Sequence, residues 1–217
     1  MTTLSDKAKA TRKRILEAAI RVFSQKGYHD TRVDEIVEES GSSKGSVYFY
    51  FPGKEQIFLA LIDEFADLLA RRLTEAVAKE EGGVPKVNAA LKTCLETFGR
   101  YRGLAKIFLI QAVGLGAAFE AKRLEIHQRF AEIVKVHLDQ AVAEGTIPPV
   151  DSEVVAIAWL GAINEVVIRW VHTGQPHPDR ILFTLRTMLL RGIGVREEEI
   201  AALAPSAVEY TEKPIDD

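Results

Sequence analysis

A stretch of twenty residues near the amino terminus combines hydroxyl groups, lysines and aromatic rings: ESGSSKGSVYFYFPGKEQIF, residues 39–58. Serine and tyrosine hydroxyls and lysine ammonium groups are side chains that hydrogen-bond phosphates and the edges of bases. Four aromatic residues follow one another from Tyr48 to Phe51, so a single helix face cannot bury them all. We expect some of these rings to face a partner, and the surrounding chemistry favours a nucleic acid.

Two short helices must position these groups. Apolar residues at helical spacing predict a helix over residues 33–39, opened by Thr31 and Asp34 as a capping box. A turn around Gly41 ends this helix, and a second helix is expected over residues 43–49. This is the spacing of a helix-turn-helix. A plain corner of two helices with a solvated polar face is the competing interpretation.

From Thr11 to Phe58 the sequence, which includes RVDEIVEESGSSKGSVYFYFPGK, resembles the TetR family of transcriptional repressors. The resemblance implies three amino-terminal helices, a larger helical ligand domain, a homodimer and a palindromic double-stranded DNA operator. It also implies DNA contacts by Thr31, Arg32, Ser42, Ser43, Lys44, Gly45, Ser46, Tyr48, Tyr50 and Lys54.

The distribution of charge agrees with a head that meets a polyanion. Residues 1–54 contain ten Lys and Arg against seven Asp and Glu, whereas residues 55–217 contain eighteen against twenty-four. Together with the resemblance, which implies the ligand domain, we expect an all-α protein with three parts: a helix-turn-helix DNA-binding domain at 1–53, a ligand-binding and dimerisation domain at 54–195, and an acidic tail at 196–217.

Helical periodicity continues through the body of the chain. Further helices are expected over 54–79, 86–101, 103–118, 120–144, 151–172 and 177–193. The last two have more apolar surface than one partner helix can cover, which predicts a homodimer through a symmetric four-helix contact that includes Ile163 and Leu185.

Composition excludes several classes of protein. The single cysteine, Cys94, rules out an intrachain disulfide, and the polar amino terminus does not resemble a signal peptide, so a cytoplasmic location is expected. The most apolar stretch, residues 154–171, contains Asn164, Glu165 and Arg169, and is expected to be a buried helix rather than a membrane span. Residues 55–217 contain no catalytic, cofactor or metal motif that would indicate an enzyme.

The segment GAINEVVIRWVHTGQ, residues 161–175, resembles the penultimate helix of the TetR branch that represses fatty-acid degradation and senses long-chain acyl-CoA. This likeness implies a small apolar or amphipathic ligand whose acyl chain lies among Phe98, Phe108, Leu109, Val113 and Phe130. It implies that the CoA phosphates meet Arg100, Arg102 and Lys106, for which a solvated basic helix end is the alternative.

Asn164 and Glu165 interrupt an otherwise apolar helix. They either face the ligand or are satisfied internally, with Arg169 one turn beyond Glu165 as its ion-pair partner. Two other functions stay open: a multidrug sensor in which Glu165 meets a cationic drug, and a small acyl-binding or acyl-transfer protein. The absence of a nucleophile–base pair in the sequence argues against the last of these.

Overall fold

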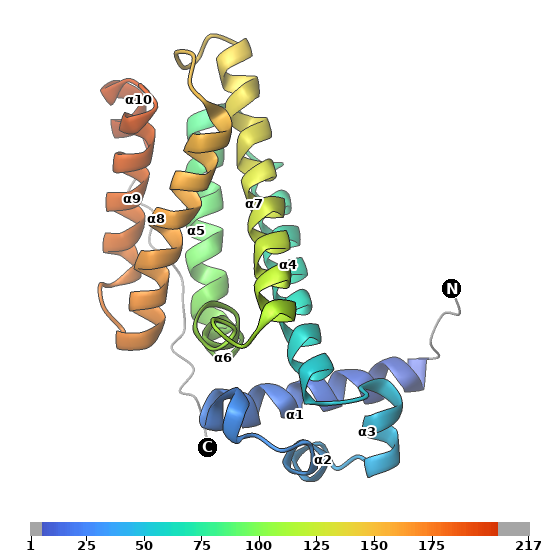
Figure 1. Ribbon diagram of the computed structural model, residues 1–217. Coiled ribbons are helices and arrows are strands. Elements are labelled where there is room, and N and C mark those ends of the chain that lie inside the picture. The colour runs from blue at the N-terminus through green and yellow to red at the C-terminus, as the bar shows by residue number, and fades with distance from the viewer. Residues whose placement is uncertain (1–5, 204–217) are drawn as a thin grey trace.

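The computed structural model describes residues 6–203, and within them every regular element is a helix, which confirms the all-α prediction (Figure 1). In chain order the elements are α1 (Asp6–Asp30), α2 (Val33–Ser40), α3 (Lys44–Tyr50), α4 (Lys54–Val77), α5 (Gly83–Arg100), α6 (Arg102–Lys106), the π-helix η1 (Ile107–Gln111), α7 (Ala117–Ala143), α8 (Ser152–Thr173), α9 (Pro178–Gly192) and α10 (Glu197–Ala201).

Helices α1, α2 and α3 form a head beneath the upright bundle of α4, α5, α7, α8 and α9 (Figure 1). Ile36 of α2 and Val47 of α3 are fully buried in the core that these helices share with α1. Gly41, with a φ of 60°, ends α2 in the left-handed conformation that glycine adopts without strain. The Ser43 hydroxyl accepts a hydrogen bond from the backbone nitrogen of Ser46, 3.2 Å away, and so caps α3.

The start of α2 differs from the prediction. The Glu35 carboxylate accepts a hydrogen bond from the backbone nitrogen of Arg32 at 2.8 Å, whereas the buried Thr31 hydroxyl donates to the carbonyl of Gly27 at 2.7 Å. The predicted capping box of Thr31 and Asp34 is therefore wrong. Carbonyls near the end of α1 lack partners along the helix, and Thr31 satisfies one of them.

Lys54, the first residue of α4, fastens the end of α1 to the start of α4. Its Nζ donates to the carbonyls of Tyr28, His29 and Thr31 at 2.7, 3.1 and 2.9 Å, and lies 4.5 Å from the centre of the Tyr28 ring. One ammonium group thus satisfies three backbone oxygens in the turn that leads to α2.

The predicted helix over 103–118 is wrong. The chain instead forms α6 and then the single-turn π-helix η1, and leaves helical geometry before α7. Gly114 and Gly116 have φ values of 76° and 120°, which residues with a side chain rarely adopt. The periodic apolar pattern that predicted the helix continues through these two glycines. Their backbone conformation nevertheless ends the helix.

Helix α8 is long and apolar enough to cross a membrane by length and composition alone. It packs along α7, but Val154 and Ile157 on its outer side are 60% and 58% exposed, so the helix that was predicted to be buried is buried on one side only. Helix α10 occupies part of the predicted acidic tail and packs on α9. Residues 204–217 of that tail lie outside the part of the chain that the structure describes.

Replacing Lys54 by methionine should reduce the free energy of unfolding by about 2 kcal/mol, because three carbonyls lose a charged donor. Thermal and urea denaturation followed by circular dichroism measure the change. Lys79→Met, at an exposed position just after α4, is the matched control. Equal stability of the two variants would contradict the fastening role.

Candidate DNA interface and ligand-responsive core

The outer surface of the head carries most of the residues predicted to contact DNA. Arg32, Ser43, Lys44, Gly45 and Tyr48 are exposed. Ser46 and Tyr50 are partly exposed on the same short helix or its cap. The structure therefore brings seven of the ten predicted residues to the surface around α3, a helix whose buried side is fixed by Val47.

A carboxylate restrains the central lysine of this surface. Lys44 Nζ lies 2.8 Å from an Asp34 oxygen, and this hydrogen bond raises the pKa of Lys44 above its ordinary value. The same ammonium lies 6.0 Å from the centre of the Tyr48 ring. Lys44 is therefore fully charged at neutral pH, but Asp34 competes with a phosphate for it.

Three of the predicted contact residues turn inward. Thr31 is 1% exposed and binds the Gly27 carbonyl. Ser42 is 9% exposed, and its Oγ lies 3.3 Å from Nη2 of Arg14. All three hydrogen bonds that Lys54 Nζ makes go to backbone carbonyls. These three side chains make contacts inside the head, and their predicted contacts with DNA stay predictions.

Phe49 is an exposed residue that the predicted contact set missed. Its side chain is 77% exposed, and its ring meets the Tyr50 ring edge to face with centroids 5.1 Å apart. The signal was present in the sequence: four consecutive aromatic residues cannot all lie on a buried face. Phe49 adds an apolar group to a surface otherwise made of hydroxyls and cations.

The aromatic residues predicted to line a ligand site meet in the core of the body. The Phe65 ring contacts the rings of Phe98 and Phe108, with centroids 5.3 and 5.5 Å apart. Leu109 and Phe130 are also buried. The fifth predicted lining residue, Val113, is 54% exposed beyond η1 and does not belong to this core.

Two of the three predicted phosphate-binding residues donate hydrogen bonds to backbone carbonyls. Arg102 Nη2 donates to the carbonyl of Val171 at 3.1 Å, and Lys106 Nζ donates to the carbonyl of Ser24 at 3.1 Å. Arg100 is exposed, with its guanidinium 5.8 Å from the centre of the neighbouring Tyr101 ring. Two of these cations thus hold helices together, and only Arg100 fits the alternative of a solvated basic helix end.

Segment α6–η1 is the junction between the body and the head (Figure 1). Gln111 Nε2 donates to the carbonyl of Phe23 at 3.0 Å, beside the bond from Lys106 to Ser24. A Cβ added at Gly103 would lie 3.3 Å from the Ile20 side chain, so α6 lies directly against α1. A π-helix often marks a functional site, and η1 also presents Phe108 to the aromatic core.

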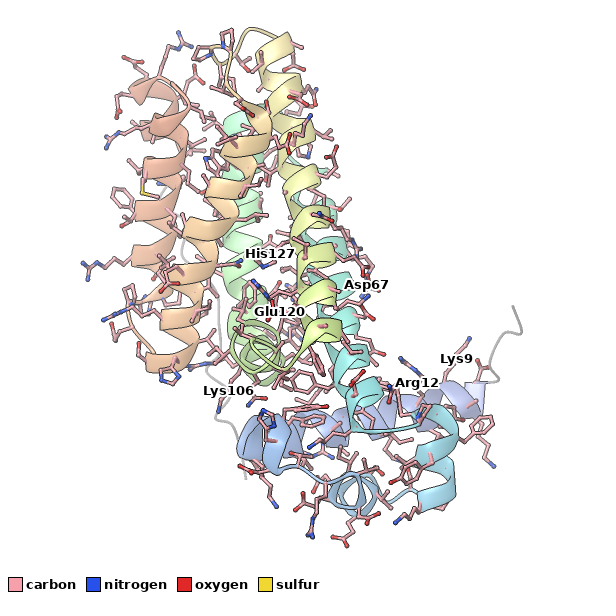
Figure 2. The ribbon with its side chains drawn as sticks, viewed as in Figure 1. Lys9, Arg12, Asp67, Lys106, Glu120 and His127 are labelled. Carbon is pink, nitrogen blue, oxygen red and sulfur yellow. The ribbon has the colours of Figure 1, made fainter. Side chains whose placement is uncertain are left out.

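A polar pair lies between α7 and α8. Asn164 Nδ2 and His127 Nε2 are 3.3 Å apart, and Figure 2 shows His127 within the bundle above Glu120. Burial, with a smaller effect from Arg123, lowers the pKa of His127 below its ordinary value, so the imidazole is neutral at pH 7. This contact gives Asn164 a partner inside the bundle.

Glu165 does not share that environment. Glu165 and Arg169 are both exposed on α8, so the alternative of a buried ion pair between them is wrong. Within residues 6–203, no three His, Cys, Asp or Glu side chains are placed together to hold a metal ion.

Family models account for most of the chain. Residues 15–61 match the amino-terminal model described as bacterial regulatory proteins of the tetR family, and residues 80–193 match the tetracyclin repressor-like carboxy-terminal domain. The helix-turn-helix transcriptional regulator YdgC of Bacillus subtilis is 31% identical over 196 residues, which is 88% of this chain and 96% of that protein.

Solved structures share the fold at lower identity. The fatty acid degradation regulator FadR from Bacillus halodurans superposes with a TM-score of 0.80 at 18% identity, covering 90% of this chain and all of that one. FadR from Bacillus subtilis, solved in complex with stearoyl-CoA, has a TM-score of 0.76 at 21% identity over 83% of this chain and 98% of its own. With both domains matched, the chain belongs to the TetR family of bacterial regulatory proteins and is a DNA-binding transcriptional regulator, not an enzyme.

Proposed function

We propose that this regulator binds a palindromic operator as a homodimer through α3 and is released by a long-chain acyl ligand such as acyl-CoA. One observation supports this proposal most strongly: α6–η1 touches the buried aromatic core on one side and α1 on the other. A ligand that shifts η1 in the core therefore also pulls on the helix that supports the DNA-binding surface. The protein acts in the cytoplasm, where its operator lies.

The acyl ligand is favoured by the chemistry of the core and by similarity. The residues around η1 are phenylalanines and aliphatic side chains, and each methylene buried among them contributes about 0.8 kcal/mol. FadR from Bacillus subtilis, which has the same fold, was solved with stearoyl-CoA. The ligand of this chain is proposed to be of the same class, with the acyl chain beside Phe98 and Phe108.

Release follows from a shift in population between two arrangements of the heads. Recognition helices in successive major grooves must be about 34–36 Å apart. Ligand binding beside Phe108 favours a position of η1 in which its bonds to the Phe23 and Ser24 carbonyls move α1. The two heads then no longer match the operator spacing.

The proposed dimer surface is the outer side of α8 and α9. Val154, Ile157, Phe183 and Met188 are between 49% and 63% exposed there, which is unusual for large apolar side chains gathered on two neighbouring helices. Leu185, one of the residues first expected in this contact, is 4% exposed and packs inside the protomer. The contact between protomers is therefore assigned to the four exposed residues.

A multidrug sensor is the weaker alternative. It requires Glu165 to meet a cation in a desolvated aromatic site, because cation–carboxylate attraction is strong only away from water. Glu165 is exposed, whereas Trp159 and Trp170 are buried. The alternative therefore lacks its central contact.

Substitutions on the DNA-binding surface should act in opposite directions. Lys44→Met should weaken binding to all sequences and reduce the salt slope by about one unit, since one phosphate loses a cation. Asp34→Asn should strengthen binding about threefold or more, because the lysine is freed from its internal partner at 2.8 Å. Fluorescence anisotropy against salt concentration measures both. Weaker binding by Asp34→Asn would contradict the assignment.

The ligand response should depend on Gln111. Dodecanoyl-CoA should release the wild-type protein from its operator. Gln111→Leu should still bind this ligand but require at least about fivefold more of it for half release, because the link to Phe23 is lost. Gln128→Leu, an exposed position on α7, is the control. If no acyl-CoA changes operator binding by the wild-type protein, the proposed ligand class is wrong.

Dimerisation should depend on the outer side of α8. Ile157→Glu should give a folded monomer, because an unpaired charge cannot be buried in the contact. Leu124→Glu, on α7, is a close control, since Leu124 and Ile157 are 59% and 58% exposed in the protomer. Sedimentation velocity measures the oligomeric state. Dissociation by Leu124→Glu with a stable dimer in Ile157→Glu would move the interface to α7.

A further inference from the structure

Helix α3 presents one large apolar side chain on the surface that is proposed to meet DNA. Phe49 is 77% exposed, and a phenyl ring has no hydrogen-bonding group. Its exposed neighbours on the helix are of a different kind, because Lys44 and Tyr48 offer an ammonium group and a hydroxyl. Phosphates and polar base edges are bound by such donors. Phe49 therefore needs an apolar group on the DNA to which it can pack.

A glycine lies one turn before Phe49 on the same helix. Residues four apart are neighbours on a helix surface, so the place of the missing Gly45 side chain is beside Phe49. A Cβ added at Gly45 would meet no atom within 4 Å, and the φ of Gly45 is outside the positive range that favours glycine. Alanine is also the better helix former. Within residues 6–203 nothing therefore requires a glycine at this position, and its open side is available to the DNA.

The major groove of B-DNA offers one apolar group to such a surface. Its base edges present hydrogen-bond donors and acceptors, and thymine adds a C5-methyl group. The second helix of a helix-turn-helix lies in this groove, with its first residues at the base edges. Gly45 is the second residue of α3, and Phe49 follows one turn later. Both positions are thus on the part of the helix that meets the bases.

We propose that Gly45 and Phe49 together read a thymine in each half of the operator through its 5-methyl group. The methyl group occupies the open side of Gly45 and packs on the ring of Phe49. Phe49 is then a specificity-determining residue, and it distinguishes thymine by the burial of apolar surface and not by a hydrogen bond.

This contact rests on the proposed function for DNA binding through α3. It is independent of the acyl ligand and of release from the operator. It adds the chemical feature of the operator that α3 recognises.

Deoxyuridine lacks only the 5-methyl group of thymidine and therefore tests the contact. An operator is first selected from random DNA with the full-length protein, and each thymine is then replaced in turn in both half-sites. At one thymine of each half-site, the replacement should weaken wild-type binding about fourfold per half-site, the effect of one buried methyl group. Phe49→Ala should bind the two operators equally well. Fluorescence anisotropy measures the affinities.

Three results of this scan would overturn the proposal. The selection enriches no operator, or no thymine methyl group affects wild-type binding, or Phe49→Ala keeps the full preference for thymine. Weaker binding by Phe49→Ala without any effect of deoxyuridine would mean that the ring contacts the DNA elsewhere.

Gly45→Ala provides a second test with the opposite sign. The added methyl group takes the place assigned to the thymine methyl, so this variant should bind the deoxyuridine operator more tightly than the thymine operator. Gly83→Ala, at the start of α5, is the matched control. Gly83 is also exposed, has no positive φ and leaves a Cβ free of contacts within 4 Å. The control should keep the wild-type preference for thymine.

Thermal denaturation without DNA should show that neither alanine lowers the melting temperature, because both positions have room for a Cβ. If Gly45→Ala weakens binding to both operators equally, the methyl group does not lie against Gly45 and the proposal is wrong.

The outcomes also separate this contact from the proposed function. If Lys44→Met reduces the salt slope as expected while no deoxyuridine matters, DNA binding through α3 stands and the thymine contact is wrong. If the effect of deoxyuridine depends on Phe49 but no acyl-CoA releases the operator, the thymine contact stands and the proposed regulation is wrong.

Discussion

The structure depends on the contact of α6–η1 with α1. Lys106 and Gln111 donate to two successive carbonyls, those of Ser24 and Phe23, just before the kink of α1 at Gly27. Carbonyls in the last turns of a helix are available for such bonds. Through these two side chains the body holds the head at the point where α1 turns toward α2. A shift of α6–η1 would therefore also move α1.

Most helices could be predicted from the sequence because the signals that define them, apolar spacing and turn residues, lie within the segment itself. Apolar spacing located the long helices of the body, and the glycine at Gly41 located the turn of the head. The prediction of one helix over residues 103–118 was wrong because of features that are not local in the sequence. Gly114 and Gly116 adopt positive φ, and the π-helix before them packs against α1 and α4. The spacing of apolar residues predicts neither the backbone conformation of a glycine nor packing between distant helices.

The candidate sites were predictable to a lesser degree, because residue type does not say which way a side chain points. Lys54 has the chemistry of a phosphate ligand, yet its ammonium satisfies three carbonyls inside the head. Glu165 interrupts an apolar helix but lies on its exposed side.

The most direct test of ligand-driven release is the distance between the two heads of the dimer. A spin label at Glu38→Cys, exposed on α2, can be attached selectively because Cys94 is buried and burial raises its thiol pKa to about 12. Electron–electron double resonance should show that the distance between the two spin labels increases by several ångströms when dodecanoyl-CoA is added. The heads then no longer have the spacing that fits half-sites about 34–36 Å apart. An unchanged distance distribution at a ligand concentration that releases the operator would contradict the account.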